Sequence, residues 1–345
     1  MQRIKTCLCF AMAVLIGALC LLGCSGRTEY KVSGFMLGTV VELTAYGPQA
    51  EAAIQAGMDR IREIEELMSV NVTESDINII NQKAGRGPVK VHEDTFNVIQ
   101  RGVYYSQKTG GAFDISILPL VRLWGIGTDQ ARVPDEQEIS RVLPAVGYEN
   151  IALYPESLEV ELTKEGMALD LGGIAKGYAA DEVGRIFRQR GIKNAIINLG
   201  GDILLMGSRP DNTPWKVGIQ NPSKPKGQYM AKVEIENRAV VTSGDYERYF
   251  EQDGIRYHHI LDPTKGYPAR SGVVSVSVIA GRAMDADALS TALFVLGPDR
   301  GMKLIEGLEG VEAIIIKDDK SVLISSGLKE NFEITDKEFR LGEEG

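Results

Sequence analysis

Two motifs far apart in the chain carry residue types that bind phosphate and divalent metal ions. The first is Ala168-Leu-Asp-Leu-Gly-Gly-Ile-Ala-Lys-Gly-Tyr-Ala-Ala-Asp181, in which Asp170 ends an expected strand and Lys176 lies one turn into an expected helix. Two glycines between them let backbone come close to a ligand, and amide groups at the start of a helix face an anion. This pattern favours phosphate binding, although Gly-Gly before a helix also occurs where elements pack tightly.

The second motif is Met284-Asp-Ala-Asp-Ala-Leu-Ser-Thr-Ala-Leu293. Asp287 and Thr291 stand four residues apart, so on a helix both oxygens project from one face toward a common point. A carboxylate and a hydroxyl suit magnesium, a hard cation. The alternative is that both residues decorate a helix surface. The surrounding residues are apolar, however, and apolar helices seldom bury polar groups without a partner.

The N-terminal segment predicts export and lipid attachment. Arg3 and Lys5 precede the apolar run 7–22, which is shorter than a comfortable membrane span and is typical of a signal-peptide core. The run ends in Leu21-Leu-Gly-Cys24, which resembles a bacterial lipoprotein cleavage box. We therefore expect a signal peptide at 1–23, a lipid on Cys24, a tether at 24–33 and a folded domain at 34–340. The alternative is one uncleaved anchor helix; both place the domain on the extracytoplasmic (periplasmic) side of the cell membrane.

Composition narrows the functional class. The four cysteines, Cys7, Cys9, Cys20 and Cys24, all fall within the exported segment. The remaining chain therefore has no disulfide, cysteine-ligated zinc or cysteine nucleophile. A net charge of −9, without a basic cluster, argues against nucleic-acid binding.

The hydrophobic pattern predicts an α+β fold with mixed, largely antiparallel sheets and flanking helices, in one large domain of two interlocked lobes. Expected helices lie at 50–68, 75–81, 93–108, 135–143, 174–190, 283–296 and 300–308, and 110–119 reads as loop. Expected strands lie at 40–46, 151–162 (a hairpin), 194–206 (two strands broken by Gly200-Gly201), 215–219, 229–235, 239–243, 257–261, 273–279, 313–317, 322–325 and 332–335.

Two adjacent histidines precede an Asp-Pro pair. Histidine carries protons near neutral pH, and a carboxylate such as Asp262 is suited to orient one. In a strand, His258 and His259 point to opposite faces, so one of them is expected to be structural.

Five ordered motifs resemble the ApbE family, the FAD:protein FMN transferases, from Phe35 to beyond Leu296. They are Gly111-Ala-Phe-Asp114, Asp170-Leu-Gly-Gly-Ile-Ala-Lys-Gly-Tyr178, Asn198-Leu-Gly-Gly-Asp202, His259-Ile-Leu-Asp-Pro263 and Asp285-Ala-Asp-Ala-Leu-Ser-Thr291. The resemblance implies an ApbE or T-fold-like arrangement and a Mg²⁺-dependent enzyme. Such an enzyme transfers the FMN half of FAD to a threonine hydroxyl of a membrane-bound redox subunit, as a phosphoester, and releases AMP.

The resemblance also implies residue roles. Magnesium ligands would be Asp287, Thr291 and the Gly173 carbonyl. We expect His259 to take or position the acceptor proton, oriented by Asp285 or Asp262. Leu37 and Asn71 stand where the family has methionine and an aromatic residue. With these two, the expected FAD contacts are Ala112, Phe113, Asp114, Asp170, Lys176, Ile260 and Leu261.

Two other functions remain open at this point. In the first, water replaces threonine and the protein is a Mg²⁺-dependent FAD pyrophosphatase that yields FMN and AMP. In the second, a lipid-tethered protein binds flavin without cleaving it. The second needs no metal, so it leaves Asp287 and Thr291 without a purpose.

Overall fold

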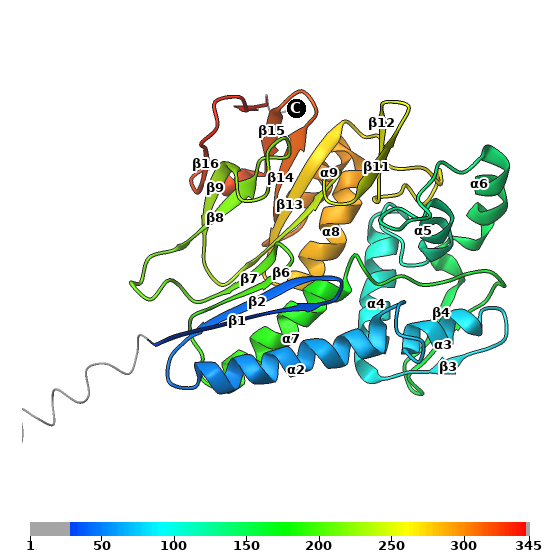
Figure 1. The fold of residues 1–345 in the computed structure, drawn as a ribbon, viewed down its shortest axis with the longest axis horizontal. Helices are drawn as coiled ribbons and strands as arrows, with labels where there is room; N and C mark the ends of the chain where they lie inside the picture. Colours follow the sequence, from blue (N-terminus) through cyan, green and yellow to red (C-terminus); the bar gives the residue numbers. More distant parts are fainter. Residues whose placement is uncertain (1–27, 343–345) are drawn as a thin grey trace, which may run out of the picture.

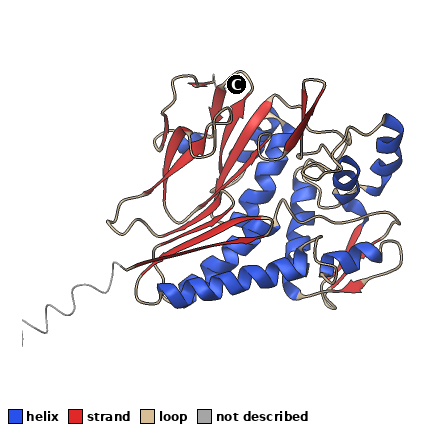
Figure 2. Cartoon of the chain, in the orientation of Figure 1, coloured by secondary structure: helices blue, strands red, loops and turns tan. Residues whose placement is uncertain are grey.

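A computed structural model describes residues 28–342. Its main element is a nine-stranded sheet (Figures 1 and 2). Neighbouring strands are antiparallel except for the last pair, which is parallel. In spatial order the strands are β1 (Glu29–Met36), β2 (Thr39–Tyr46), β6 (Ala195–Leu199), β7 (Asp202–Met206), β10 (Ala239–Gly244), β13 (Val273–Ala280), β14 (Glu312–Lys317), β15 (Ser321–Ile324) and β17 (Arg340–Leu341).

Smaller sheets and helices surround this large sheet. The small sheets are β16 (Phe332–Ile334), β9 (Tyr229–Ile235) and β8 (Trp215–Gln220), in that order; β3 (Val89–Lys90), β5 (Glu159–Leu162) and β4 (Ile151–Tyr154); and the pair β11 (Tyr249–Gln252) and β12 (Ile255–His258). The α-helices are α2 (Ala50–Met68), α3 (Asp76–Gln82), α4 (Glu93–Lys108), α5 (Leu118–Trp124), α6 (Glu136–Val142), α7 (Ala175–Gln189), α8 (Ala283–Leu296) and α9 (Pro298–Glu306). Short 3₁₀ turns lie at Leu143–Ala145, Tyr148–Asn150 and Ser326–Leu328.

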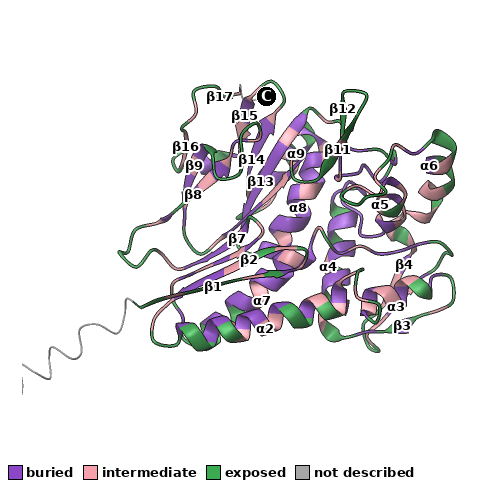
Figure 3. Cartoon of the chain, in the orientation of Figure 1, coloured by how far each residue is buried: buried purple, intermediate pink, exposed green. Residues whose placement is uncertain are grey.

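The large sheet separates two hydrophobic cores. Side chains alternate between the faces of a strand, and neighbouring residues of β7 and β10 accordingly enter different cores. Leu204 and Val241 pack with α2, α7 and α8 on one face. Leu205 and Val240 pack with β8 and β9 on the other. Figure 3 shows the resulting buried layer along the inner sides of these elements.

Helices α7 and α8 touch along their backbones because of Gly177. A Cβ atom at this position would lie 2.5 Å from the carbonyl carbon of Ala283 and 2.6 Å from Cα of Met284. Asp181, one turn further along α7, accepts hydrogen bonds from the amides of Ala283 and Met284 at 2.8 and 3.0 Å. These contacts fix the start of α8 against α7, and with it the two motifs found in the sequence.

The structure confirms the expected α+β class and most of the expected elements. The helices expected at 50–68, 93–108 and 283–296 and the strand at 229–235 have the predicted bounds. The tether expected at 24–33 is wrong in its second half, because β1 begins at Glu29. The strand has alternating exposed residues at a sheet edge, so its sequence resembles a polar linker. The loop expected at 110–119 is shorter than predicted, because α5 begins at Leu118. The strand expected at 257–261 also ends earlier, at His258.

The expected signal peptide and the lipid-bearing Cys24 lie outside the described residues. Within residues 28–342, no helix combines the length and apolar character needed to span a membrane.

Candidate active site

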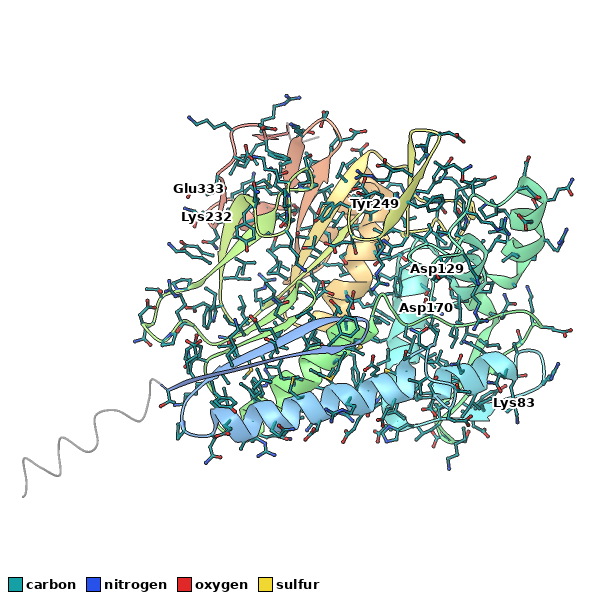
Figure 4. All side chains as sticks on the ribbon, in the orientation of Figure 1. Lys83, Asp129, Asp170, Lys232, Tyr249 and Glu333 are labelled. Atoms are coloured by element: carbon teal, nitrogen blue, oxygen red, sulfur yellow. The ribbon has the colours of Figure 1, made fainter. Side chains whose placement is uncertain are left out.

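A cavity of about 590 Å³ brings the two sequence motifs together. Its volume is in the range of small-molecule and cofactor sites. Asp170, labelled in Figure 4, lies near the tip of the β1–β2 hairpin in this view. The residues expected from the sequence that line the cavity are Ala112, Phe113, Asp114, Asp170, Gly173, Lys176, His259, Ile260, Leu261, Asp287 and Thr291.

Oxygen atoms from the two motifs converge at one end of the cavity. Asp287 on α8 is buried, and its Oδ2 accepts a hydrogen bond from the Gly177 amide at 3.0 Å. One turn later, Thr291 places Oγ1 3.4 Å from the hydroxyl of Ser243 on β10. A Cβ atom on Gly173 would lie 3.5 Å from this Oγ1, so the Gly173 backbone also borders the group.

Two carboxylates flank Lys176 at this end of the cavity. Lys176 pairs with the buried carboxylate of Asp202, and its Nζ lies 3.6 Å from Asp287 Oδ1. Although burial opposes it, attraction to these two carboxylates raises the pKa of Lys176. Burial, with repulsion from Asp202, raises the pKa of Asp287 to about 6 despite the attraction of Lys176. One ammonium group therefore faces two carboxylates.

These donors fit a magnesium ion. A buried carboxylate with a raised pKa is stabilised by a nearby cation, and Mg²⁺ takes oxygen ligands. The protein offers the carboxylate of Asp287 and the hydroxyl of Thr291, and the Gly173 backbone lies beside them. Residues 28–342 hold no group of three or more His, Cys, Asp and Glu side chains arranged to bind a metal. A site with so few protein ligands suits Mg²⁺, which keeps several waters or substrate phosphate oxygens.

His259 lines the cavity with a ring that has one unprotonated nitrogen. Its Nδ1 lies 3.2 Å from the backbone oxygen of Arg248. Because a carbonyl only accepts hydrogen bonds, Nδ1 carries the proton and Nε2 keeps its lone pair. Burial and the positive charge of Arg248 lower the pKa of His259 to about 4, so the ring is neutral near pH 7.

The neighbouring His258 is the structural histidine that alternation predicted. It is buried, its Nε2 lies 2.9 Å from the carbonyl oxygen of Ala269, and its Nδ1 accepts the amide of Ile260 at 3.3 Å. Both ring nitrogens are therefore used in holding the turn after β12. Desolvation lowers the pKa of this ring as well.

Asp170 and Asp114 fix loops that line the cavity. Asp170 Oδ1 accepts the amide of Gly172 at 2.7 Å, which shapes the Gly-Gly turn before α7. Asp114 accepts both the amide and the hydroxyl of Ser116, at 2.8 and 2.7 Å, and the amide of Tyr148 at 3.0 Å. In each carboxyl group burial is the largest influence and raises the pKa.

An apolar wall lies beside these polar groups. Phe113 is buried, and a Cβ on Gly173 would stand only 3.1 Å from its ring. Leu261 and Ile260, after β12, supply further buried apolar surface along the same cavity. A flat aromatic ligand finds apolar contacts here within reach of the charged end.

Two expected carboxylates are not brought to the cavity. Asp285 receives two hydrogen bonds of 2.8 Å from the guanidinium of Arg101 on α4, so it joins α8 to α4. Asp262 accepts the amide and hydroxyl of Thr264 and pairs with Lys265 at 2.9 Å, which closes a tight turn. Neither contacts His259, so the expectation that Asp285 or Asp262 orients this ring is wrong. The backbone carbonyl of Arg248 contacts the His259 ring instead.

Leu37 and Asn71 are also absent from the cavity lining. Leu37 adopts a positive φ of 52° in the turn between β1 and β2, where its amide donates to Glu65 Oε1 at 2.8 Å. Asn71 is exposed on the loop after α2. The cavity lining at this hairpin comes from Thr39 instead.

Sequence reasoning missed two charged residues of the site. Asp202 was noticed only as part of a glycine turn, yet it is the buried partner of Lys176. Arg248 lines the cavity from the segment between β10 and β11, and its side chain has no hydrogen bond or ion pair within residues 28–342. Its charge lowers the pKa of both His259 and Asp170. An arginine between Glu247 and Tyr249 is an ordinary surface residue in sequence, so only the fold reveals its place in the cavity.

The cavity continues around the turn between β6 and β7 to the other face of the large sheet. Thr39, Gly200 and Gly201 line this junction. A Cβ on Gly200 would collide with Thr39, so glycine is required where the turn meets the β1–β2 hairpin. Beyond the turn, the lining residues include Ile196, Ile203, Leu205, Trp215, Lys216, Val217, Gly218, Gln220, Lys226 and Tyr229. We call the region around Asp170, His259 and Asp287 the first arm, and this continuation the second arm.

Comparison with known proteins gives one consistent result. The ApbE family model matches residues 37–315. A protein of Treponema pallidum named FAD:protein FMN transferase is 34% identical to this chain, and the match covers 98% of this chain and 99% of the relative. A protein of Klebsiella pneumoniae with the same name is 36% identical, and the match covers 92% of this chain and 98% of the relative. The solved ApbE protein of Thermotoga maritima has a TM-score of 0.82 at 34% identity, covering 88% of this chain and 99% of that one. The flavin transferase ApbE of Vibrio cholerae has a TM-score of 0.79 at 29% identity, covering 88% and 99%. The fold, the motifs and these similarities agree, and the chain is a member of the ApbE family.

Proposed function

We propose that this protein transfers the FMN half of FAD to a threonine hydroxyl of an acceptor protein and releases AMP. The relatives named FAD:protein FMN transferase cover nearly the whole chain, which supports this activity. The observation that carries the proposal is the first arm. One cavity holds a buried carboxylate beside a hydroxyl, a lysine, and a histidine with an unprotonated ring nitrogen.

The charges of the first arm suit the pyrophosphate of FAD. Lys176 and the unpaired Arg248 both line the cavity and supply positive charge. The apolar surface of Phe113 and Leu261 suits a flat ring of the same molecule. A ligand with a ring at one end and a pyrophosphate in its middle therefore finds both kinds of contact in one arm.

Asp287, Thr291 and the Gly173 carbonyl are the residues we propose for Mg²⁺. When bound, the ion would neutralise charge on the pyrophosphate and stabilise the departing AMP phosphate. Lys176 reduces the repulsion between Asp202 and Asp287, and the Gly177 amide holds one oxygen of Asp287 in place.

The chemical step exchanges one phosphorus–oxygen bond for another. The threonine oxygen bonds to the FMN-side phosphorus, the bond from that phosphorus to the bridging oxygen breaks, and the electron pair leaves with AMP. Nε2 of His259 accepts the hydroxyl proton, which a poor nucleophile such as threonine must lose. The Arg248 carbonyl keeps the ring in the tautomer that can do so. No oxidation or reduction occurs.

The N-terminal sequence supports a location for this reaction. We propose that Cys24 carries lipid and that the enzyme works at the extracytoplasmic side of the cell membrane. The acceptors we propose are membrane-bound redox subunits with an exposed threonine on that side.

Intact mass spectrometry tests the proposal. The detergent-solubilised full chain is incubated with FAD, Mg²⁺ and the threonine-bearing domain of a redox subunit from the same bacterium, which we call the acceptor domain. A mass gain equal to one FMN phosphoester, abolished by EDTA and absent when the target threonine is replaced by valine, is the expected result. Release of free FMN and AMP without a gain would identify a pyrophosphatase. FAD that stays intact with every acceptor would identify a flavin-binding protein.

A further inference from the structure

Strand β8 exposes its backbone edge to the second arm of the cavity. It is an outer strand of the small sheet, in which β9 lies between β16 and β8. In Figure 1, β8 is the strand of this sheet nearest to β6 and β7. Side chains of a strand alternate between two faces, yet residues of both parities line the cavity: Trp215, Lys216, Val217, Gly218 and Gln220. Because residues from both faces of β8 line the cavity, the edge of this strand faces it.

Hydrogen bonds within the small sheet show which backbone groups of β8 are free. On β9, the amide of Glu234 donates toward β16, to the Asn331 oxygen at 3.0 Å. Glu234 stands opposite Lys216 in the ladder. In antiparallel pairs the backbone groups of successive residues point to opposite sides, so the N–H and C=O of Lys216 point away from β9. Gly218, two residues later, shares this direction.

These groups have no partner within residues 28–342, because no hydrogen bond joins the backbone of Lys216 or Gly218 to anything beyond β9. On the far side of β9 the ladder is closed by β16, where Lys232 and Glu333 pair at 2.7 Å (Figure 4). Free strand edges are templates for a further strand, and proteins usually cover them. This edge is left open where the cavity runs along it.

We propose that β8 binds an extended segment of the acceptor protein by strand addition, with backbone hydrogen bonds to Lys216 and Gly218. This inference rests on the proposed function, which requires a second polypeptide to reach the cavity. A polypeptide supplies alternating donors and acceptors at the spacing of this edge, whereas FAD does not. The half-buried Ile196 and Ile203 on the large sheet offer apolar contacts to alternate side chains of the bound segment.

The position of the second arm also favours the acceptor over FAD. The second arm joins the first at the Gly200-Gly201 turn, next to Lys176 and Asp202. A segment bound along β8 therefore leads its hydroxyl toward the phosphate-binding end while the first arm remains available to FAD. A segment bound in the second arm thus brings the hydroxyl close to the phosphate-binding end and leaves the first arm free for FAD.

Proline substitution at the edge tests this proposal. Lys216→Pro removes one free N–H, and proline is tolerated where the N–H of an edge strand faces away from its neighbour. Lys216→Ala removes the same side chain, and its ion pair with Glu234 at 3.2 Å, but keeps the N–H. Lys31→Pro is the matched control. Lys31 is on the edge strand β1, pairs with Glu42 at 2.8 Å, and lies outside the cavity lining.

Steady-state transfer and FAD binding are measured for the three variants and the parent chain with the acceptor domain. We expect Lys216→Pro to raise the KM for the acceptor domain roughly tenfold, as for loss of a hydrogen bond at an interface, while the Kd for FAD changes less than about twofold. Lys31→Pro should keep both values near those of the parent. Lys216→Ala gives the effect of losing the side chain alone, so the acceptor KM of Lys216→Pro should clearly exceed that of Lys216→Ala. An unchanged acceptor KM in Lys216→Pro would overturn the proposal. An equal weakening of FAD binding would assign the second arm to FAD and overturn it too.

Amide hydrogen exchange gives a second reading that needs no variant. The acceptor domain with its target threonine replaced by valine should slow exchange at Lys216 and Gly218, and FAD alone should not. Absence of this protection at saturating acceptor domain would contradict strand addition. If the parent chain transfers no FMN, the proposed function fails, and exchange still shows whether the acceptor domain docks on β8.

Discussion

The imidazole of His259 is held by the backbone carbonyl of Arg248, 3.2 Å from Nδ1, and not by a carboxylate. A carboxylate partner would favour the protonated ring, whereas a carbonyl fixes the tautomer without adding a full negative charge. Burial and the Arg248 charge lower the pKa of this ring, so it is neutral near pH 7 with Nε2 unprotonated.

Replacement of His259 should affect the chemical step more than FAD binding. General bases contribute about 10²- to 10⁴-fold to rates, so we expect His259→Ala to lower kcat for transfer by about 100-fold or more. The Kd for FAD, followed by flavin fluorescence, should change by less than about threefold. Equal losses in kcat and FAD affinity would make His259 a binding residue.

Protonation of His259 should lower the rate of transfer only at acidic pH. Its pKa of about 4 lies below the usual value, so the active neutral form persists through the neutral range and is lost only as pH falls toward 4. Arg248→Gln removes one cause of the lowered pKa, so the acid limb of the kcat profile should move to higher pH, whereas Arg248→Lys should not move it. Saturating Mg²⁺ is needed, because Asp287 has a pKa of about 6. An acid limb unmoved in Arg248→Gln would contradict the electrostatic coupling.

Asp287 and Thr291 should control the response to magnesium. Asp287→Asn keeps the shape of the side chain but removes its charge, and we expect transfer to fall by about 100-fold or more. Thr291→Val should weaken the apparent Mg²⁺ affinity, and Thr291→Ser, which keeps a hydroxyl, is the matched control. Initial rates against Mg²⁺ concentration measure both effects. A parental Mg²⁺ response in Asp287→Asn would refute the assignment.

Asp285 should contribute to stability and not to the reaction. It is partly exposed and holds Arg101 through two hydrogen bonds, so we expect Asp285→Asn or Arg101→Met to lower the free energy of unfolding by about 1–2 kcal/mol. Denaturant unfolding measures this change. A double variant should lose less than the sum of the two. If kcat per folded molecule fell sharply without a change in stability, Asp285 would have a role in catalysis after all.

Gly177 should be intolerant of a side chain. A Cβ would overlap the backbone of Ala283 and push α7 from α8, so Gly177→Ala should cost about 1–3 kcal/mol of stability. It should also weaken Mg²⁺-dependent transfer, because the Gly177 amide holds Asp287. Gly281→Ala, at a site with open space around the Cβ position, is the control. Equal stability of the two variants would contradict this account.

The sequence predicted the elements whose apolar residues recur with a clear period. The helix at 50–68 has buried residues at helical spacing, and α8 is apolar on nearly every side, so both were found with correct bounds. Strand β1 was missed because a sheet edge needs no continuous apolar face. Strand β12 ends before His259 because the tight turn held by Asp262 follows, and turn hydrogen bonds leave little trace in hydrophobic periodicity.

The candidate site was predicted where one helix or one turn fixes the spacing. Asp287 with Thr291, and Asp170 with Lys176, meet that condition. Asp202 and Arg248 reach the same cavity only through the packing of separate elements, which no local spacing encodes. Asp285 was misassigned for the same reason. Its partner Arg101 comes from a helix far away in the chain.

The two arms of the cavity meet at the Gly200-Gly201 turn but run along opposite faces of the large sheet. A nucleotide in one arm and a polypeptide in the other need not compete for space, so both substrates are able to form a ternary complex. With both bound, the FMN group would pass directly from FAD to the acceptor, and no residue of the enzyme would carry it covalently between two half-reactions. A sequential kinetic pattern, in place of a ping-pong one, is the signature of that architecture.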